Sequence, residues 1–181
     1  MKMLKNFTRT IASMITCMSI VSFTASAQDA APKLTDPEIA SVAVTANQID
    51  VNYGKIALKK TKNAEAKKFA ETMIKDHESI IKQAVDLATK LGVTPKDNAM
   101  TQSLLKGEKE TTAKLNKLTG KAFDKAYIDN EVAYHEAVIN AVKTVLIPQT
   151  QNAELKALLT KVTPLLDHHF EMAKMAQSKI K

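Results

Sequence analysis

Residues 63–92 read NAEAKKFAETMIKDHESIIKQAVDLATKLG, and this stretch decides the fold. Its apolar residues recur every three or four positions, which is the spacing of one face of an α-helix. That face comprises Ala70, Met73, His77, Ile80, Ala84, Leu87 and Leu91. Asn63 is a typical N-cap residue and Gly92 a typical residue just past a helix end. We therefore predict one long amphipathic helix whose buried face carries a histidine.

Two further stretches place a histidine on an apolar helix face. One face comprises Ile128, Val132, His135, Ile139, Val142 and Leu146. The other comprises Leu155, Leu158, Val162, Leu165, His169, Met172 and Ala176. A buried imidazole costs free energy unless it is hydrogen-bonded or bound to a ligand. The sequence thus predicts a polar cluster in the protein interior, built from three helices.

Another long helix precedes the opening stretch. Thr35 and Glu38 form a capping-box pattern at its start, and its apolar stripe continues to about Lys60. Gly54 lies inside this helix, and a glycine allows a neighbouring backbone to come close. Only a few residues separate this helix from the next, so we expect the two to be antiparallel neighbours.

The second half of the chain adds a crossover and two more long helices. Residues 93–119 contain one weakly apolar helix, which we expect to lie on the surface of a bundle. The third long helix spans about 122–146 and stops before Pro148, and the fourth spans about 152–179. One long connection between the second and third of four helices is the ferritin-like arrangement. We therefore predict an all-α, ferritin-like four-helix bundle with a long helical crossover, in a single domain over residues 35–181.

Residues 1–27 have the organisation of a signal peptide. Three basic residues precede an apolar run over 11–23, and residues 25–27 read Ala-Ser-Ala, which is an A-x-A cleavage signal. We predict cleavage after this signal, a short linker over 28–34, and export to the periplasm or cell envelope; the alternative is an uncleaved anchor. No second apolar stretch of membrane length follows in the sequence, so we expect no transmembrane segment after signal removal.

Cysteine content and charge narrow the functional classes. Cys17 is the only cysteine and lies in the predicted signal peptide, so we expect no disulfide or thiol chemistry in the mature chain. Removal of the signal leaves 23 lysines against 19 acidic residues, a net charge of +4, and no arginine. The absence of arginine and the few aromatic residues argue against nucleic-acid binding. The scattered lysines predict a solvated basic surface and allow weak association with an anionic envelope surface; they do not predict an oligomeric state.

Five residues make up the candidate site: His77, His135, His169, Glu131 and Asp50. Asp50 and His77 lie at similar distances from the turn between the first two long helices. Glu131 and His169 lie at equal distances from the turn between the last two. Imidazole and carboxylate groups together suit zinc, copper, iron or manganese. We therefore predict an interior site for one of these transition metals.

A hydrogen-bonded layer without any ligand is the alternative interpretation. Core histidines that bond to carboxylates or tyrosines are ordinary, and Tyr53, Tyr127 and Tyr134 are available as partners. Asp76 precedes His77 by one residue, and Asp167 and His168 precede His169 by two and one. At about 100° per residue all three turn away from the buried faces, so we expect them at the rim or surface. This alternative predicts a structural or interaction protein whose polar layer only sets the helix register.

Enzymatic motifs are absent from the sequence. The standard di-iron pattern of such bundles needs Glu-x-x-His on two helices. Three positions before each buried histidine the chain instead has an aliphatic residue: Ile74, Val132 or Leu166. The chain also lacks a glycine-rich phosphate loop, a GxSxG elbow and an HExxH motif. We therefore expect an envelope binding or stress-related protein and assign no catalytic residue; an enzyme with redox chemistry at a mononuclear metal is the remaining alternative.

Several motifs occur together in a characteristic order. They are Ala46-Asn47, GKIA at 54–57, KFAETMIKDH at 68–77, LGVTP at 91–95, FDKAYI at 123–128 and the pair His168-His169. In this combination the chain resembles the bacterial exported family named domain of unknown function 4142, which is described as ferritin-like. The resemblance covers about residues 37–177 and implies the fold and export, but no activity. Relatives often have Glu where this chain has Asp50, so the carboxylate is kept but shortened.

Overall fold

The computed structural model describes residues 33–180, which belong to one compact unit. The predicted signal peptide and most of the predicted linker lie outside the described residues. The described elements are α1 (Asp36–Lys60), α2 (Ala64–Leu91), α3 (Ala99–Lys117), α4 (Gly120–Ala141), the π-helical segment η1 (Val142–Leu146), α5 (Ile147–Gln149) and α6 (Ala153–Lys179). Over residues 33–180 there is no strand, and the prediction of an all-α fold is confirmed.

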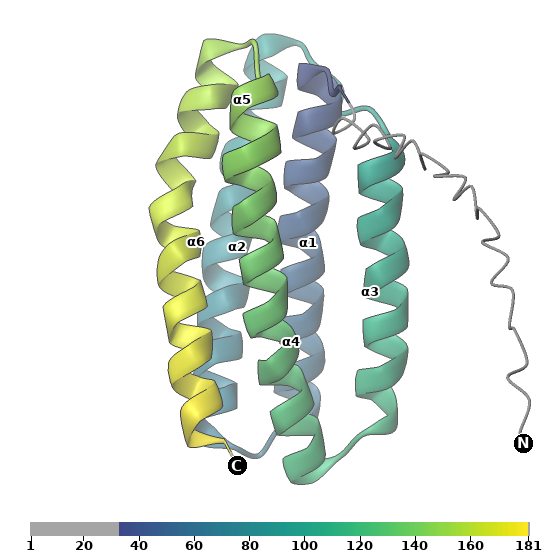
Figure 1. Cartoon of the computed structure of the whole chain (residues 1–181), viewed down its shortest axis with the longest axis vertical. Helices are drawn as coiled ribbons and strands as arrows, with labels where there is room; N and C mark the ends of the chain where they lie inside the picture. The colour runs from purple at the N-terminus through teal and green to yellow at the C-terminus, as the bar shows by residue number, and fades with distance from the viewer. Residues whose placement is uncertain (1–32, 181) are drawn as a thin grey trace, which may run out of the picture. The chain divides into compact units, whose positions relative to one another are not determined.

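The long helices α1, α2, α4 and α6 lie side by side as a four-helix bundle, and α3 packs outside them against α1 (Figure 1). The pair α1–α2 is antiparallel, and so is the pair α4–α6. Helix α3 returns the chain to the end of the bundle where α2 began, so α2 and α4 run in the same direction. The predicted long helical crossover between the second and third bundle helices is therefore confirmed.

Polar caps and one glycine define where the helices begin and end. The side-chain oxygens of Asn63, Asn98 and Asn152 each accept hydrogen bonds from two backbone N–H groups in the first turns of α2, α3 and α6. These bonds satisfy donors that have no partner inside the helix. Gly92 ends α2 with φ at 63°, a left-handed conformation that glycine adopts without steric strain. The predicted capping box forms at the start of α1.

The helix that begins at Gly120 extends further than predicted. Segments η1 and α5 continue α4 to Gln149, so the prediction that the helix stops before Pro148 was wrong. In a regular α-helix a proline ring clashes with the carbonyl four residues earlier and lacks an N–H to donate. Here a wider π-helical turn precedes the proline, and the N–H of Ile147 donates to the carbonyl of Val142, five residues back.

The buried face of α6 differs in part from the predicted face. The buried residues are Leu155, Leu159, Val162, Leu166, His169, Ala173 and Ala176. Leu158, Leu165 and Met172, which the sequence also predicts on this face, are only half-buried and pack against the edges of the core. Positions three and four residues from an inner residue flank the same helix face. The contacts of α6 with α2 and α4 decide which of these flanking positions is fully buried.

The core consists of two apolar clusters separated along the bundle. The lower cluster includes Phe69, Phe123 and Tyr127, near the turn between α1 and α2. The upper cluster includes Ile80 and Leu146, and it also contains Leu34, which precedes α1, is buried, and donates its N–H to Gln149. On α2, α4 and α6 the buried histidines fall between the residues of the two clusters.

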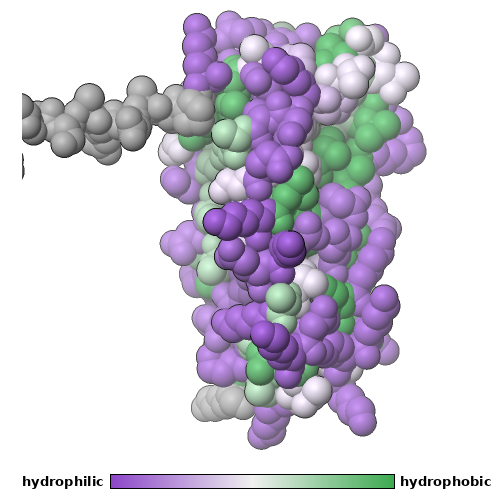
Figure 2. Space-filling view, turned by 90° about the vertical axis from the view of Figure 1, so that its right-hand side faces the viewer, coloured by the Kyte–Doolittle hydropathy of each residue, from purple (hydrophilic) through white to green (hydrophobic). Residues whose placement is uncertain are grey.

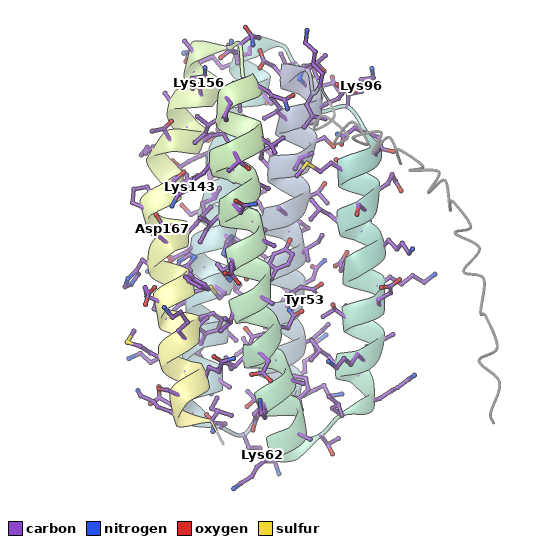
Figure 3. All side chains as sticks on the ribbon, viewed as in Figure 1. Tyr53, Lys62, Lys96, Lys143, Lys156 and Asp167 are labelled. Atoms are coloured by element: carbon purple, nitrogen blue, oxygen red, sulfur yellow. The ribbon has the colours of Figure 1, made fainter. Side chains whose placement is uncertain are left out.

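The surface of the described residues is hydrophilic. Figure 2 views the side that α3 covers, and hydrophobic residues appear there only as separate patches. Lysines lie at both ends of the bundle, and Lys143 of η1 pairs with Asp167 of α6 at 2.8 Å (Figure 3). Among the described helices, none is long and apolar enough to cross a membrane.

Candidate metal centre

The five candidate residues form one buried cluster in the bundle. Asp50 comes from α1, His77 from α2, Glu131 and His135 from α4, and His169 from α6. Each of the five is at most 3% exposed. The two polar layers that the sequence places on separate helix pairs therefore coincide.

The groups of this cluster face one another at distances too long for hydrogen bonds. Asp50 Oδ2 lies 3.5 Å from His77 Nε2 and 3.4 Å from His135 Nε2. Glu131 Oε2 lies 3.6 Å from His135 Nδ1. One ligand atom from each of the three histidines lies within 4.8 Å of the other two, and the same holds for Asp50, Glu131 and His135. The cluster therefore brings nitrogen and oxygen donors together without pairing them.

An asparagine sets the tautomer of His77. His77 Nδ1 lies 2.7 Å from Asn47 Oδ1. The orientation of this amide follows from its other contact, because Asn47 Nδ2 donates to the carbonyl of Ala43 at 2.7 Å. The amide oxygen can only accept, so His77 Nδ1 carries the proton. The unprotonated Nε2 then faces Asp50, whose Oδ2 lies 3.5 Å away.

The other two histidines are oriented in the same way by different acceptors. His135 Nδ1 donates to the backbone carbonyl of Glu131 at 2.9 Å. His169 Nε2 lies 3.1 Å from Asp76 Oδ2, on the neighbouring helix α2. Because a carbonyl and a carboxylate accept, these assignments place the free lone pairs on His135 Nε2 and His169 Nδ1.

Three ring nitrogens are consequently left without a hydrogen-bond partner. They are His77 Nε2, His135 Nε2 and His169 Nδ1, and none has a partner among the described residues. Both carboxylate oxygens of Asp50 and of Glu131 are also unpaired there. Metal-binding histidines are typically held in this manner, with one nitrogen bonded to an outer acceptor and the other nitrogen free for the ion.

Burial keeps the three imidazoles neutral. Desolvation lowers the pKa of His77 well below its usual value, and the neighbouring histidines add to the effect. Desolvation likewise lowers the pKa of His135 to about 4. It also lowers the pKa of His169, against the opposing effect of Asp76. All three are therefore in the neutral form that coordinates metals at pH 7.

Burial has the opposite effect on the two carboxyl groups. Desolvation raises the pKa of Asp50 to about 8. Desolvation raises the pKa of Glu131 well above its usual value, and the nearby Asp50 raises it further. Without a cation Asp50 holds a proton at pH 7, and the pKa of Glu131 is shifted in the same direction, whereas a bound cation would favour the ionised form of both groups.

A small cavity adjoins the cluster. Its volume is about 10 Å³, and its lining includes Asp50, His77, His135 and Asn47. This volume corresponds to roughly one water-sized sphere. The side chains thus leave room at the cluster for one small species, such as a water molecule or an ion.

Two partners of the cluster could not be identified from the sequence. Asn47 lies on α1 and orients His77 on α2, and Asp76 lies on α2 and bonds to His169 on α6. Asp76 is at the rim as expected, with its side chain 26% exposed, but its role as an acceptor was missed. The only available signals were its position next to His77 and the small polar type of Asn47.

The tyrosines do not serve as the histidines' partners. Among the described residues, no tyrosine hydroxyl bonds to a buried histidine, and Tyr134 instead donates to the carbonyl of Ala46 at 3.0 Å. The neighbouring residues that we expected at the surface lie there. His168 is exposed, and Asp167 forms the ion pair with Lys143.

The fold and the cluster together define a four-helix-bundle protein with a buried histidine–carboxylate centre. The chain belongs to the family described as Domain of unknown function (DUF4142), whose model matches residues 21–176. This match confirms the resemblance seen in the sequence motifs. No curated protein matches the chain.

A solved structure shares the fold. It is described as "CopM in the Cu(II)-bound form", and its similarity to this chain has a TM-score of 0.63 at 16% sequence identity. The similarity covers 82% of this chain and 99% of that chain. At this level of identity the likeness establishes a common helical fold.

Proposed function

We propose that this protein binds a transition-metal ion inside the bundle through His77, His135 and His169, with Asp50 and Glu131 as carboxylate ligands. The observation that carries the proposal is the orientation of the histidines. Three separate acceptors hold one N–H of each ring and leave the other nitrogen of each ring unpaired, within a group of three histidines that each bring one nitrogen within 4.8 Å of the others. Such outer partners fix the tautomer of metal-binding histidines and raise their basicity.

The donor set favours copper among the four candidate metals. Zinc, copper, iron and manganese all accept imidazole and carboxylate ligands. For a given set of nitrogen and oxygen donors, Cu²⁺ binds more tightly than the other divalent first-row ions. The structure of similar fold described as the Cu(II)-bound form of CopM supports this choice. We therefore propose that Cu²⁺ is the ion bound most tightly and that Zn²⁺ competes for the site with lower affinity.

Unpaired atoms distinguish this proposal from a purely structural layer. Seven side-chain nitrogen and oxygen atoms of the five residues lack a hydrogen-bond partner within the described part of the chain. An unsatisfied buried polar atom costs about 1–3 kcal/mol. A layer that served only helix register would be expected to satisfy these atoms, whereas a bound cation would satisfy several of them at once.

The proposed setting is the periplasm or cell envelope, where the protein would act as a non-catalytic binding or stress-related protein. The predicted signal peptide over residues 1–27 supports export. An exported binding protein with a buried site would hold its metal away from solvent. Its lysine-rich surface is compatible with weak attraction to anionic envelope surfaces.

Metal analysis of purified protein tests the proposal directly. The protein is dialysed separately against Cu²⁺, Zn²⁺, Fe²⁺ and Mn²⁺, and bound metal is measured by mass spectrometry. We expect about one Cu²⁺ per chain, lost in His135→Gln and retained in His168→Gln. His168 is the matched control, because it is an exposed histidine adjacent to the cluster residue His169. Equal binding by wild type and His135→Gln, or none by wild type, would overturn the proposal.

A second experiment tests the outer partner of His169. Asp76→Ala removes the acceptor that bonds to His169 Nε2 and removes no proposed ligand. Loss of such a partner typically weakens metal binding by about 10–100-fold. Asp86→Ala on the same helix is the control, since Asp86 is exposed and pairs with the exposed Lys82. Isothermal titration with Cu²⁺ measures both, and equal affinities would contradict the assigned role of Asp76.

A further inference from the structure

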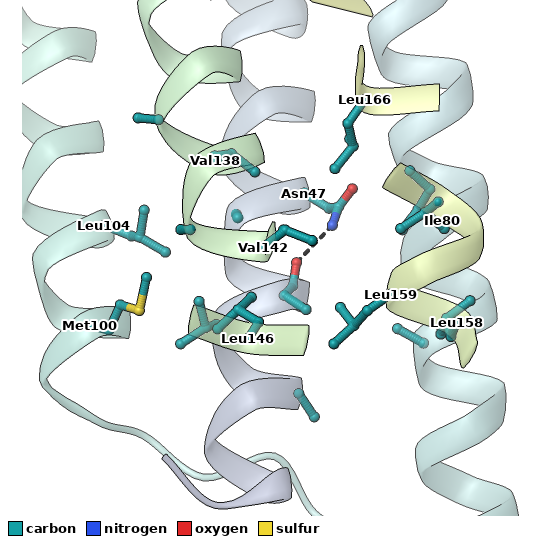
Figure 4. A pocket seen from close by; sticks show the side chains of 18 of the residues that line it. Asn47, Ile80, Met100, Leu104, Val138, Val142, Leu146, Leu158, Leu159 and Leu166 are labelled. Carbon is teal, nitrogen blue, oxygen red and sulfur yellow. Dashed lines mark hydrogen bonds between the residues drawn. The ribbon is translucent and has the colours of Figure 1, made fainter. Parts of the chain in front are cut away.

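A large apolar pocket adjoins the histidine cluster on the side of the upper apolar cluster. Its volume is about 540 Å³, and its walls come from all four bundle helices and from α3. Side chains of Met100, Leu104, Val142, Leu158, Leu159 and Leu166 face into it (Figure 4). The pocket is thus a feature of the bundle interior and its crossover helix together.

The size of this pocket is that of a ligand site. Protein interiors contain few voids larger than a water molecule. An apolar cavity of about 150 Å³ already binds benzene, and pockets for small molecules occupy about 300–1,000 Å³. At 540 Å³ the space exceeds the benzene-binding cavity more than threefold.

The pocket is long and narrow. On α1 its lining residues extend from Asp36 to Tyr53, which is about 25 Å of helix at the usual rise per residue. On α4 and η1 they extend from Asn130 to Leu146. A volume of 540 Å³ distributed over that length fits an extended chain better than a compact molecule.

The charges of the lining select against an anion. Asp36 and Glu108 line the pocket, and no lysine does, although the folded chain is rich in lysine. Both carboxylates already accept hydrogen bonds, Asp36 from the backbone N–H groups of Gln151 and Asn152 and Glu108 from the side chain of Asn52. A ligand carboxylate or phosphate would therefore meet negative charge and no cation. The lining fits an uncharged molecule.

Small side chains leave an entrance between α3 and α4. Ser103 and Gly107 on α3 and Ala133 and Ala137 on α4 all line the pocket and are exposed. The pocket shares Asn47 with the small cavity at the histidine cluster. A ligand could therefore enter from solvent and reach the vicinity of the cluster without separating the bundle helices.

We propose that this pocket binds an uncharged, single-chain apolar molecule of the kind represented by a long-chain alcohol. The chain lies along the leucine and valine walls, and the exposed entrance between α3 and α4 admits it. This site is independent of the metal ligands, so its occupancy is expected in metal-free protein as well.

Fluorescence of N-phenyl-1-naphthylamine, an uncharged apolar probe, tests the site in protein kept metal-free with a chelator. We expect saturable enhancement with about one probe per chain. Dodecanol should displace the probe at concentrations at least tenfold lower than dodecanoate. No saturable enhancement, or equal displacement by dodecanoate, would overturn the proposal. Because the chelator is present throughout, the result does not depend on whether the protein binds metal.

Matched variants locate the binding. Ala137→Phe narrows the entrance, and Ala43→Leu fills part of the interior of the pocket. Each should weaken probe binding at least tenfold. Ala113→Phe on α3 is the control, since Ala113 is exposed and does not line the pocket. Two pocket variants are used so that the test still holds if one of them fails to fold. Circular dichroism measures the helical content of each. Unchanged probe affinity in a folded pocket variant would contradict the assignment.

Discussion

At the residue scale, the buried carboxyl group of Asp50 makes the stability of the metal-free protein depend on pH. Burial raises the pKa of Asp50 in the folded protein to about 8, from an ordinary value of 3.8. Between these values the folded chain retains a proton that the unfolded chain releases. The stability that the protonated carboxyl contributes is therefore complete below pH 3.8 and is lost as the pH rises to about 8.

We predict that Asp50→Asn makes the metal-free protein more stable at pH 7. The amide resembles the protonated carboxyl but cannot ionise in the unfolded chain. The gain in free energy of unfolding should be on the order of 4 kcal/mol at pH 7 and should diminish toward pH 4. Urea unfolding with a chelator present measures the difference. A variant less stable than wild type at pH 7 would show that Asp50 is ionised in the folded state.

The candidate residues could be predicted because a histidine on an apolar helix face is visible in one sequence. His77, His135 and His169 interrupt apolar series of helical spacing, and all three are buried. Their outer partners could not be predicted in this way. Asn47 and Asp76 lie beside the buried faces of their helices, and each bonds to a histidine of another helix. Such pairings depend on helix rotation and axial position, which periodicity leaves undetermined.

At the element scale, Gly54 sets how closely α1 and α2 pack. A Cβ atom at this position would lie 2.8 Å from Cγ1 of Ile74 and 3.2 Å from the carbonyl oxygen of Ala70. The first distance is shorter than a normal contact, and the second involves backbone that cannot easily move. The expected close approach at Gly54 is therefore found, and it holds α2, with His77, against the helix that carries Asp50.

We predict that Gly54→Ala lowers the free energy of unfolding by about 1–3 kcal/mol, as overpacking typically does. Gly107→Ala in α3 is the matched control, because a Cβ there meets no atom within 4 Å. Alanine is the better helix former, so the control should stabilise the protein by up to about 1 kcal/mol. Thermal unfolding followed by circular dichroism compares the two. If both variants are more stable than wild type, the inference that α1 and α2 pack too closely at Gly54 to admit a side chain is contradicted.

Two features of the helices differ from the sequence predictions: the end of the helix that begins at Gly120, for a local reason, and the buried face of α6, for a tertiary one. The π-helical turn of η1 allows the helix to continue past Pro148, although proline ordinarily predicts a helix end. On α6, Leu159 and Leu166 are buried, whereas the predicted Leu158 and Leu165 are only half-buried. Apolar residues stand at both sets of positions, so only contacts with α2 and α4 select between them.

At the scale of the whole molecule, the two apolar clusters compensate for the polar layer between them. The lower cluster lies toward the turn between α1 and α2, and the upper one toward the turn before α6. Hydrophobic burial on both sides stabilises the bundle, while the unpaired groups of the layer destabilise it. A ligand that pairs these groups should therefore stabilise the whole fold.

We predict that Cu²⁺ or Zn²⁺ raises the free energy of unfolding by about 2.7 kcal/mol when free metal is at 100 times its dissociation constant. Because the raised pKa of Asp50 keeps its proton at pH 7, binding should release protons and tighten from pH 6 to pH 8. Unfolding with and without metal, and titrations in two buffers of different ionisation enthalpy, measure these effects. The same stabilisation in His135→Gln would place the metal elsewhere.

The sequence by itself determined the all-α class, the four long helices with their crossover, and the three inward histidines. These follow from the spacing of apolar residues and from caps such as Asn63 and Gly92, which act within one helix. Only the tertiary structure decided that Asp50 and Glu131 join the three histidines in one cluster, and which acceptors fix the histidine tautomers. It alone also revealed the apolar pocket beneath α3. The physical reason is that these features arise between helices, from their relative rotation, height and distance.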